Sequence, residues 1–497
     1  MAPNARNVSG MAENATAMTS TLAHRVRHVR WSLELPRRRE QWVAIVAVLV
    51  LGTVAAHSIP GAGKHVPKPL MVVLVLAGAS ILLSIANQQL FLGWLLVAPI
   101  FQESASNSRT GHLLALALYT APPIAFAVKA RAAAGPRPRR LFIDLFPMLY
   151  VALLLLSLFI SASGELKHGA VSTVRNFYQT ILIGVIVYYV AAFWRGRGLS
   201  VTLIARIVMI AAALQAAMAT IELGTGWNLW HDETWAIGGQ PRSIATLANP
   251  AVTGAFIGVG MVIALAVLCW RGPASLHRLA VVMLVVGLPG LYATKTRGPI
   301  LATAIVSGLC LLLSSRGRLV GVGVSALIAL TLVLFWPQIR ASSVYTSRFD
   351  QKQNVQERLV LQEVSIKLAE KRPILGWGYD SFDRVKYDVP VASPSIPLEE
   401  VLKTTSHDTF LTIMVEFGAV GLLLFVVPWV VIIVRALRAA RAPSARRWFL
   451  VAGVGSILVI AINGGTLDYR FFSFIPMVAW LFLGLLRRQL EPESAAP

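Results

Sequence analysis

The chain has 497 residues, of which 56% are hydrophobic and only 14% charged, and its formal net charge is +22. Soluble domains are nearer half apolar and a quarter charged, so this composition excludes an ordinary soluble protein and indicates a membrane-embedded one. No run combines a basic face with stacking aromatic side chains in a soluble module, so the positive charge does not indicate binding to nucleic acid.

Apolar stretches recur along nearly the whole chain, as a polytopic helical membrane protein requires. We predict an all-α fold of about 12–14 transmembrane helices. The count is a range because the third apolar stretch is short and two later ones lie very close together. The predicted spans are 42–58, 69–86, 89–102, 112–128, 141–161, 174–194, 200–222, 249–270, 279–293, 298–314, 319–337, 409–434, 448–463 and 471–486.

The loops between these spans carry their basic residues unevenly. If the N-terminus is cytoplasmic, the inner loops hold sixteen Lys or Arg and no acidic residue, whereas the short outer loops hold eight basic and five acidic residues. By the positive-inside rule, the polar basic tail 1–41 and the tail 487–497 are predicted to be cytoplasmic. Transmembrane helices then occupy 42–337 and 408–486, on either side of a long outer loop at 338–407.

The outer loop 338–407 is about 70 residues long, far beyond ordinary connectors, which indicates a functional or folded segment. A helix is predicted over 354–373, with Asn354 and Glu357 as a capping pair and Pro373 at its end. A turn-rich segment, "ILGWGYDSF", follows it. The apolar face of the helix is predicted to consist of Val355, Leu359, Val364 and Leu368.

Three outward-facing stretches place polar side chains at the mouths of predicted spans. Arginines at this interface can bind a phosphate or pyrophosphate through forked, charge-assisted hydrogen bonds, and a histidine can take a proton from a hydroxyl. The sequence does not show whether the stretches converge. They hold Arg242, Lys295, Arg297, His407, Asp408 and Glu416.

Each of these residues also has a structural interpretation. A single arginine at a helix mouth commonly anchors the helix at the headgroups, and an isolated histidine commonly forms a local hydrogen bond. A carboxylate as deep as that of Glu416 needs a partner, which could be Arg470 or Arg175. The sequence contains no metal-binding pattern and no Walker-type phosphate loop, so neither a metal nor another cofactor is predicted.

Four segments carry a family resemblance: "PRSIATLANP", "TKTRGPIL", "ERLVLQEVSIKLAEKRPILGWGYDSF" and "SHDTFLTIMVEFGAVGLLLF". In this order they resemble the arginine before Asn-Pro, the Arg-Gly element, the arginine-led loop helix and the His-Asn…Glu-x-Gly pattern of one superfamily. That superfamily comprises the bacterial O-antigen ligases and O-antigen polymerases. The chain departs from the pattern at Asp408, which replaces the commoner Asn, and at Ala251, which replaces a frequent second Asn.

The resemblance implies a metal-independent membrane glycosyltransferase of the C-type architecture. Its donor would be an undecaprenyl-pyrophosphate-linked glycan at the periplasmic face of the bacterial inner membrane. Arg242 and Arg297 would bind the pyrophosphate, and His407 would activate or orient the acceptor hydroxyl. Further candidates for substrate binding, of which Arg358 matches the loop arginine, are Lys295, Arg175, Arg358, Asp408 and Glu416.

Three functions remain open at this point. The leading hypothesis is a ligase that transfers a finished glycan onto a lipid A-core sugar or a related acceptor, and the position of the long loop favours it slightly. The alternative is a polymerase that joins lipid-linked repeat units into O-antigen, capsule or exopolysaccharide. A transporter of the lipid-linked glycan is the third, but the absence of an internal repeat and the gathering of polar residues at the outer rim favour an enzyme.

Overall fold

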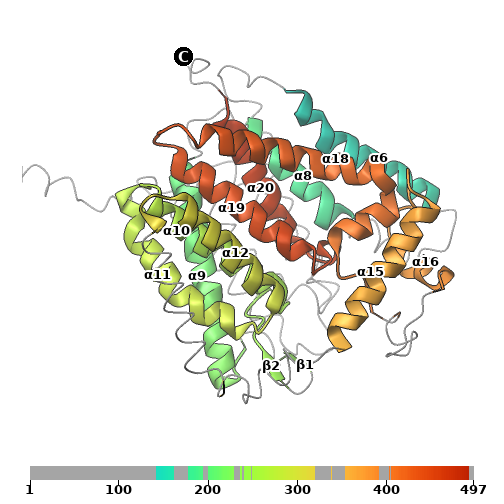
Figure 1. Cartoon of the computed structure of the whole chain (residues 1–497), viewed down its shortest axis with the longest axis horizontal. Coiled ribbons are helices and arrows are strands. Elements are labelled where there is room, and N and C mark those ends of the chain that lie inside the picture. The colour runs from blue at the N-terminus through green and yellow to red at the C-terminus, as the bar shows by residue number, and fades with distance from the viewer. Residues whose placement is uncertain are drawn as a thin grey trace, which may run out of the picture. The chain divides into compact units, whose positions relative to one another are not determined.

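The protein is a polytopic membrane protein built almost wholly from helices, as predicted (Figure 1). The computed structural model describes residues 141–161, 177–193, 200–228, 235–237, 240–247, 249–318, 337, 353–390, 402 and 404–491. The first four predicted spans and nearly all of 319–337 lie outside these residues, so the total helix count stays a prediction. Within the described part, five helices are long and apolar enough to cross a membrane: α9 (Val201–Thr225), α10 (Pro250–Cys269), α11 (Ala274–Ala293), α18 (Thr409–Ala439) and α19 (Arg447–Gly464).

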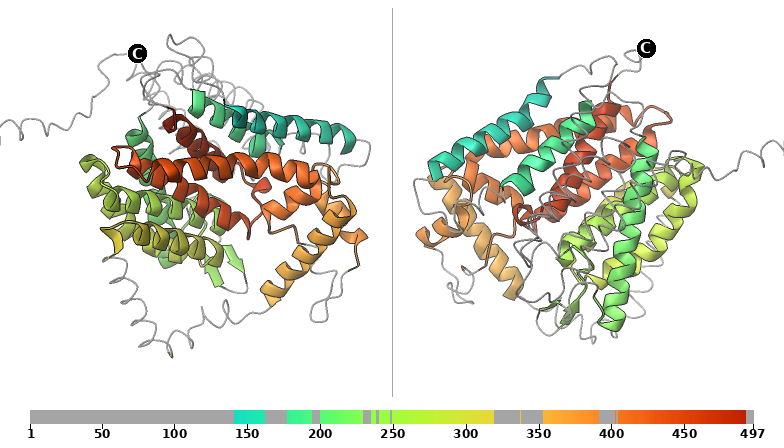
Figure 2. Two further views of the ribbon diagram at one scale, coloured as in Figure 1. Left: turned by 45° about the horizontal axis from the view of Figure 1, so that its top comes forward. Right: turned by 180° about the vertical axis from the view of Figure 1, so that it is seen from behind.

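Shorter apolar helices pack among these five. The helix α20 lies along α8, and α10 contacts α9, α11, α12 and α19 (Figure 2). The predicted spans agree with the helices, except that α11 begins already at Ala274 and α18 continues to Ala439. The shorter helices are η1 (Phe142–Leu145), α6 (Phe146–Ser161), η2 (Tyr178–Leu182), α8 (Ile183–Phe193), α12 (Arg297–Leu313) and α20 (Phe474–Gln489).

A buried ion pair joins the start of α6 to the end of α20. Nε and Nη2 of Arg487 donate to the carboxylate of Asp144 at 2.9 and 3.0 Å, and the hydroxyl of Tyr188 donates to the same carboxylate at 2.8 Å. Both charged side chains are almost fully buried. Such a buried charge is tolerated because it is paired and hydrogen-bonded.

The outer loop contains the predicted helix, α15 (Gln353–Lys371), but two details of the prediction were wrong. The helix already begins at Gln353, so Asn354 is its second residue and not its cap. Val364 and Leu368 are buried, whereas Val355 and Leu359 are 46% and 58% exposed. At about 100° per residue, Val355 lies on the opposite side of the helix from Val364, which the predicted face overlooked.

The described residues that follow α15 in the loop, up to 390, fold onto its buried side. Val360 and Leu361 join Val364 and Leu368 in a small core with side chains of α16 (Phe382–Val385). Beyond α16, the short η3 (Lys386–Asp388) carries a buried lysine. The Nζ atom of Lys386 pairs with Asp383 at 2.7 Å and donates to the carbonyl of Thr404 at 2.9 Å. This pairing ties the loop to the segment that leads into α18.

The long helix α18 is broken at Gly418, where the backbone adopts φ 63° and ψ −166°. Residues 373–378 of the outer loop satisfy the backbone groups that the break releases. The N–H groups of Trp377 and Gly378 donate to the carbonyls of Val415 and Glu416 at 2.9 and 2.8 Å. In return, the N–H groups of Ala419 and Val420 donate to the carbonyls of Pro373 and Ile374 at 2.8 and 3.2 Å. The turn-rich segment is confirmed, and we call its pairing with α18 the clasp.

Two glycines with positive φ make the clasp possible. A Cβ atom at Gly376 would lie 2.4 Å from the backbone carbon of Glu416, and one at Gly418 would lie 2.2 Å from the carbonyl oxygen of Ile374. Both clashes are with backbone atoms, which cannot move aside as a flexible side chain could.

Replacement of Gly376 by Ala is expected to destabilise the protein by about 2–5 kcal/mol, from the strained φ and the overpacking together. Gly308→Ala in α12 is the matched control, because nothing lies within 4 Å of the added methyl group. Thermal unfolding of both variants in detergent checks this expectation, and an equal melting temperature for the two would contradict it.

Candidate functional site

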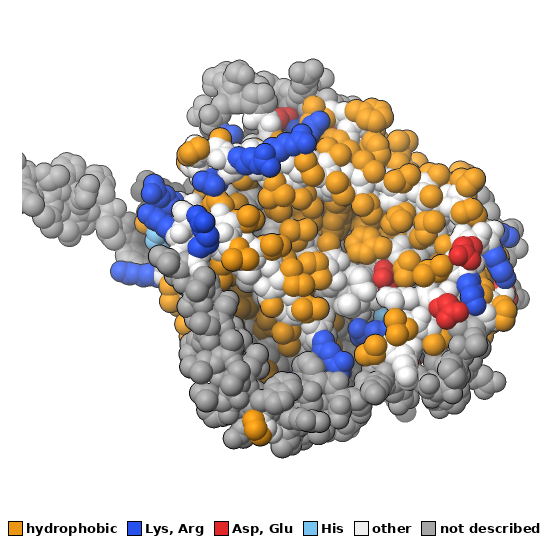
Figure 3. Space-filling view, in the orientation of Figure 1, with side chains coloured by type: hydrophobic (Ala, Val, Ile, Leu, Met, Phe, Trp, Pro, Cys, Tyr) orange, Lys and Arg blue, Asp and Glu red, His pale blue; other side chains and the backbone are white. Residues whose placement is uncertain are grey.

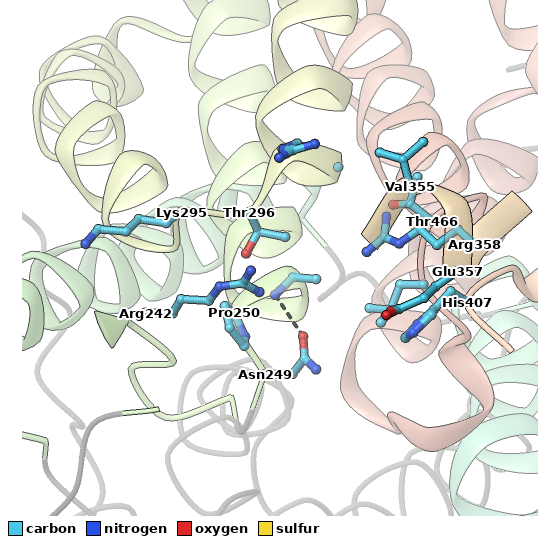
Figure 4. Close-up of a pocket in the computed structure, with 14 residues that line it drawn as sticks. Arg242, Asn249, Pro250, Lys295, Thr296, Val355, Glu357, Arg358, His407 and Thr466 are labelled. Atoms are coloured by element: carbon cyan, nitrogen blue, oxygen red, sulfur yellow. Dashed lines mark hydrogen bonds between the residues drawn. The ribbon is translucent and has the colours of Figure 1, made fainter. Parts of the chain in front are cut away.

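A cavity of about 250 Å³ opens at the N-terminal ends of α10 and α12. Figure 4 shows that it has two walls that face each other, with Arg242, Asn249 and Lys295 on one side and Arg358 and His407 on the other. The cavity thus brings together the three outward-facing stretches that sequence analysis singled out, together with the start of α15. It is lined by Arg242, Asn249, Pro250, Ala251, Lys295, Thr296, Arg297, Gly298, Val355, Glu357, Arg358, His407, Thr466 and Leu467.

Arg242 reaches the cavity from a small hairpin that was not predicted. The strands β1 (Trp235–Ile237) and β2 (Gln240–Arg242) pair in antiparallel register, with Trp235 opposite Arg242. The N–H of Ser243 then donates to the carbonyl of Ala293 at 3.2 Å, which sets Arg242 beside the turn at 294–296.

A buried carboxylate on α9 holds the segment after Arg242 in place. One oxygen of Glu222 accepts hydrogen bonds from the N–H groups of Ile244 and Ala245 at 3.0 and 2.8 Å. On the same helix, Gln215 donates to the hydroxyl of Thr246 at 2.7 Å. Sequence analysis missed Glu222 and Gln215, although polar residues inside an apolar span were a signal that could have revealed them.

Asn249 and Pro250 start α10 as the Asn-Pro motif requires. The side chain of Asn249 caps the helix by accepting from the N–H of Ala251 at 2.8 Å, and Pro250 occupies the first turn, where no N–H partner is needed. A cap of this kind fixes the angle at which the chain enters the helix beside Arg242.

Arg297 is the first residue of α12 and lies half-buried in the cavity. A Cβ atom on the next residue, Gly298, would come within 2.4 Å of the hydroxyl of Thr466 and 2.8 Å of the amide oxygen of Asn463. The glycine of the Arg-Gly element therefore lets α12 approach the segment after α19 closely. This approach places Arg297 against the wall that also carries His407.

His407 precedes Asp408, the cap residue of α18, and hydrogen bonds hold the two residues that follow it in place. The hydroxyl of Thr409 donates to the carbonyl of Leu467 at 2.7 Å and accepts from the N–H of Tyr469 at 3.0 Å. Asp408 caps α18 by accepting from the N–H groups of Phe410 and Leu411 at 2.9 and 3.0 Å. Asp408 also lines a small neighbouring pocket with Arg358 and His407.

The electrostatic environment favours a neutral imidazole at His407. Burial and the nearby charge of Arg358 lower the pKa of His407 below its ordinary 6.5, and Asp468 opposes this shift. Desolvation and the charge of Arg297 lower the pKa of Arg358 in the same way. The cavity combines four cationic side chains with one acidic side chain, Glu357, so it is suited to a ligand with more than one negative charge.

Glu416 does not line the cavity. It is fully buried and forms an ion pair with Arg470, which also binds Asp468 through Nη2 at 2.7 Å. The N–H of Phe382 donates to the same Glu416 oxygen at 3.3 Å. Two arginines were considered from the sequence as partners of Glu416. The structure shows Arg470 as the partner, and Arg175 lies outside the described residues.

The described residues contain no group of three or more His, Cys, Asp or Glu side chains that could hold a metal ion.

A comparison with known protein families matches the segment from the middle of α11 to the middle of α18. Residues 282–426 match the family model described as O-antigen ligase. This part of the chain is similar to the O-antigen ligase family. The match confirms the resemblance to the O-antigen ligase and polymerase superfamily that the motifs predicted, whose members are glycosyltransferase-like enzymes. No curated protein matches the chain.

The matched segment contributes to both walls of the cavity. Arg297, Arg358 and His407 lie inside the matched residues, as do α15 and the clasp. Arg242 and Leu467 lie outside the match and complete the cavity from segments before and after it.

Proposed function

We propose that the protein is an O-antigen ligase-type glycosyltransferase. It moves a glycan from undecaprenyl pyrophosphate to a hydroxyl of lipid A-core, or of a similar acceptor, at the periplasmic face of the bacterial inner membrane. The observation that carries the proposal is the convergence of Arg242, Arg297 and His407 on one cavity at the outer ends of membrane helices.

The proposed reaction breaks the bond between the anomeric carbon of the glycan and the pyrophosphate oxygen. The leaving electron pair remains on the pyrophosphate, where Arg242 and Arg297 stabilise the added negative charge through forked hydrogen bonds. The acceptor oxygen forms the new bond to the anomeric carbon. His407, neutral because of its lowered pKa, takes the proton that the acceptor hydroxyl loses.

Deletion of the gene, followed by gel analysis of the surface glycans, tests the proposal. Loss of polymer from lipid A-core, with full-length polymer retained on the undecaprenyl carrier, is the expected result. Core that carries a single repeat unit would instead identify a polymerase with the same donor. Failure of the glycan to reach the periplasm would identify a transporter.

The acidic side of the pH profile is expected to depend on Arg358. A general base must be unprotonated, so transfer should hold through neutral pH and fall only as the pH drops below 6.5 into the lowered pKa range of His407. Arg358→Gln removes a positive charge that lowers this pKa, so the fall in kcat/KM should move to higher pH.

The matched control is Lys367→Gln, which removes a cation from an exposed position on the same helix. Asp468, which raises the pKa of His407, is unchanged in both variants. An unshifted acidic limb in Arg358→Gln would show that another group controls it.

A further inference from the structure

The outer helix α15 is tied to the membrane boundary at its C-terminal end. α18 has 31 residues, which corresponds to about 46 Å, whereas a bilayer core is about 30 Å thick. The part after the break, 419–439, is about 31 Å long and suffices to cross the core. The break at Gly418 therefore lies at the outer boundary, and the clasp holds residues 373–378, directly after α15, at that depth.

The N-terminal end of α15 lies at the same boundary. Val355 and Arg358 line the cavity together with Arg297, the first residue of α12. α12 is an apolar helix that begins with the charged Arg297, so its first residue also marks the outer edge of the bilayer core. Because both ends lie at one depth, α15 runs along the membrane surface and does not project from it.

An exposed apolar surface runs along α15 and continues past its end. Val355, Leu359 and Ile366 occupy one side of the helix, opposite the buried Val364, and they are 46%, 58% and 49% exposed. We call them, with the 66% exposed Ile374 and the 59% exposed Leu375, the interfacial stripe.

We propose that the interfacial stripe is inserted among the lipids of the outer leaflet, so that α15 is an interfacial helix whose partner is the bilayer surface. A lipid surface fits because the stripe is continuous with a lipid-facing side of a membrane-spanning helix. Ile374 is paired with Val420 of α18, and Leu423, one turn further, is 58% exposed. Figure 3 shows hydrophobic side chains covering this face over α18 and reaching the region of α15.

Charged side chains border the stripe as in interfacial helices. Lys367 pairs with Glu363 at 3.0 Å, Lys371 donates to the carbonyl of Asp388 at 2.9 Å, and Arg372 lies 4.1 Å from the ring centroid of Trp377. Their apolar stems cover the helix while their charged ends stay at the headgroups. The consequence is that one wall of the cavity is held at the depth where a lipid-linked substrate arrives.

Collisional quenching tests this proposal without requiring enzymatic activity. The full-length protein, with Cys269 and Cys310 replaced by Ser, is labelled with a fluorophore at Leu359→Cys, Leu375→Cys or the control Lys371→Cys and reconstituted in lipid vesicles. A lipid that carries a nitroxide near its headgroup is expected to quench the first two sites about threefold more than the control, and iodide should quench them less.

Both stripe positions are exposed, so neither substitution disturbs packing, and the exposed Lys371 lies about 120° around the same helix from Leu359. Iodide quenching at Leu359 equal to that at Lys371 would overturn the proposal, because the stripe would then face water. Protection of the stripe from both quenchers would also overturn it, since a protein partner or a second copy of the chain would cover the surface.

Discussion

Arg297→Ala is expected to lower kcat/KM for glycan transfer by about 10²–10³, the usual effect of removing one donor that stabilises a developing oxyanion. Arg297 is the first residue of α12, and Gly298 packs α12 closely against Thr466. The backbone is therefore held in place and cannot move to compensate for a shorter side chain at position 297. Arg297→Lys should recover only part of the activity, because an ammonium group lacks the planar fork that matches a pyrophosphate.

The matched control is Arg278→Ala, which removes an exposed arginine near the N-terminal end of α11. Arg297 follows the C-terminal end of the same helix. Transfer should be measured on purified protein, together with direct binding of the lipid-linked donor. The Arg297→Ala variant is expected to lose donor affinity as well as rate. Activity within threefold of the wild type, measured in protein that inserts normally, would remove Arg297 from the site.

His407→Ala is expected to lower kcat by about 10²–10⁴, the range that a positioned general base contributes. Donor affinity should be retained, since the phosphate-binding cations are unchanged. His407 precedes the cap residue of α18 and lies outside that helix, so its loss should not disturb the fold. The split between kcat and donor binding therefore distinguishes His407 from Arg297.

The comparison variant for His407 is Gln362→Ala, on the part of α15 that faces the small pocket beside His407. It tests whether any truncation near the imidazole is damaging. An unchanged kcat in His407→Ala would assign the proton transfer to another group and contradict the proposed role.

The membrane helices could be predicted from the sequence because the criterion is local. An apolar run of sufficient length must become a helix in a bilayer, since no water is present to satisfy its backbone. The break in α18 could not be predicted in this way. It depends on hydrogen bonds between 373–378 and 415–420, and neither segment alone indicates that it satisfies the backbone of the other.

The face of α15 shows the same limit. Apolar residues occur on both sides of this helix, and the sequence-based prediction placed Val355 and Leu359 on one apolar face with Val364 and Leu368. The structure buries only the second pair. A helix with one side on protein and another toward lipid carries apolar residues on both, so its pattern alone does not identify the buried side.

The candidate site could be predicted in part because charge carries topological information. An arginine on the outer side, such as Arg242 or Arg297, is not explained by the positive-inside rule, and this drew attention to it. The supporting residues Glu222 and Asn463 were missed because they act on the backbone or on neighbouring side chains, without any motif of their own. Their importance follows from contacts between segments that are far apart in the sequence.

Reconstitution of the purified protein with its proposed substrates tests the central claim most directly. Vesicles would contain the protein, an undecaprenyl-pyrophosphate-linked glycan and lipid A-core, with a chelator present, and both lipid products would be followed over time. The expected result is glycosylated lipid A-core together with an equal amount of undecaprenyl pyrophosphate. Movement of the intact donor between leaflets, with no new glycosidic bond, would contradict the assignment as a glycosyltransferase.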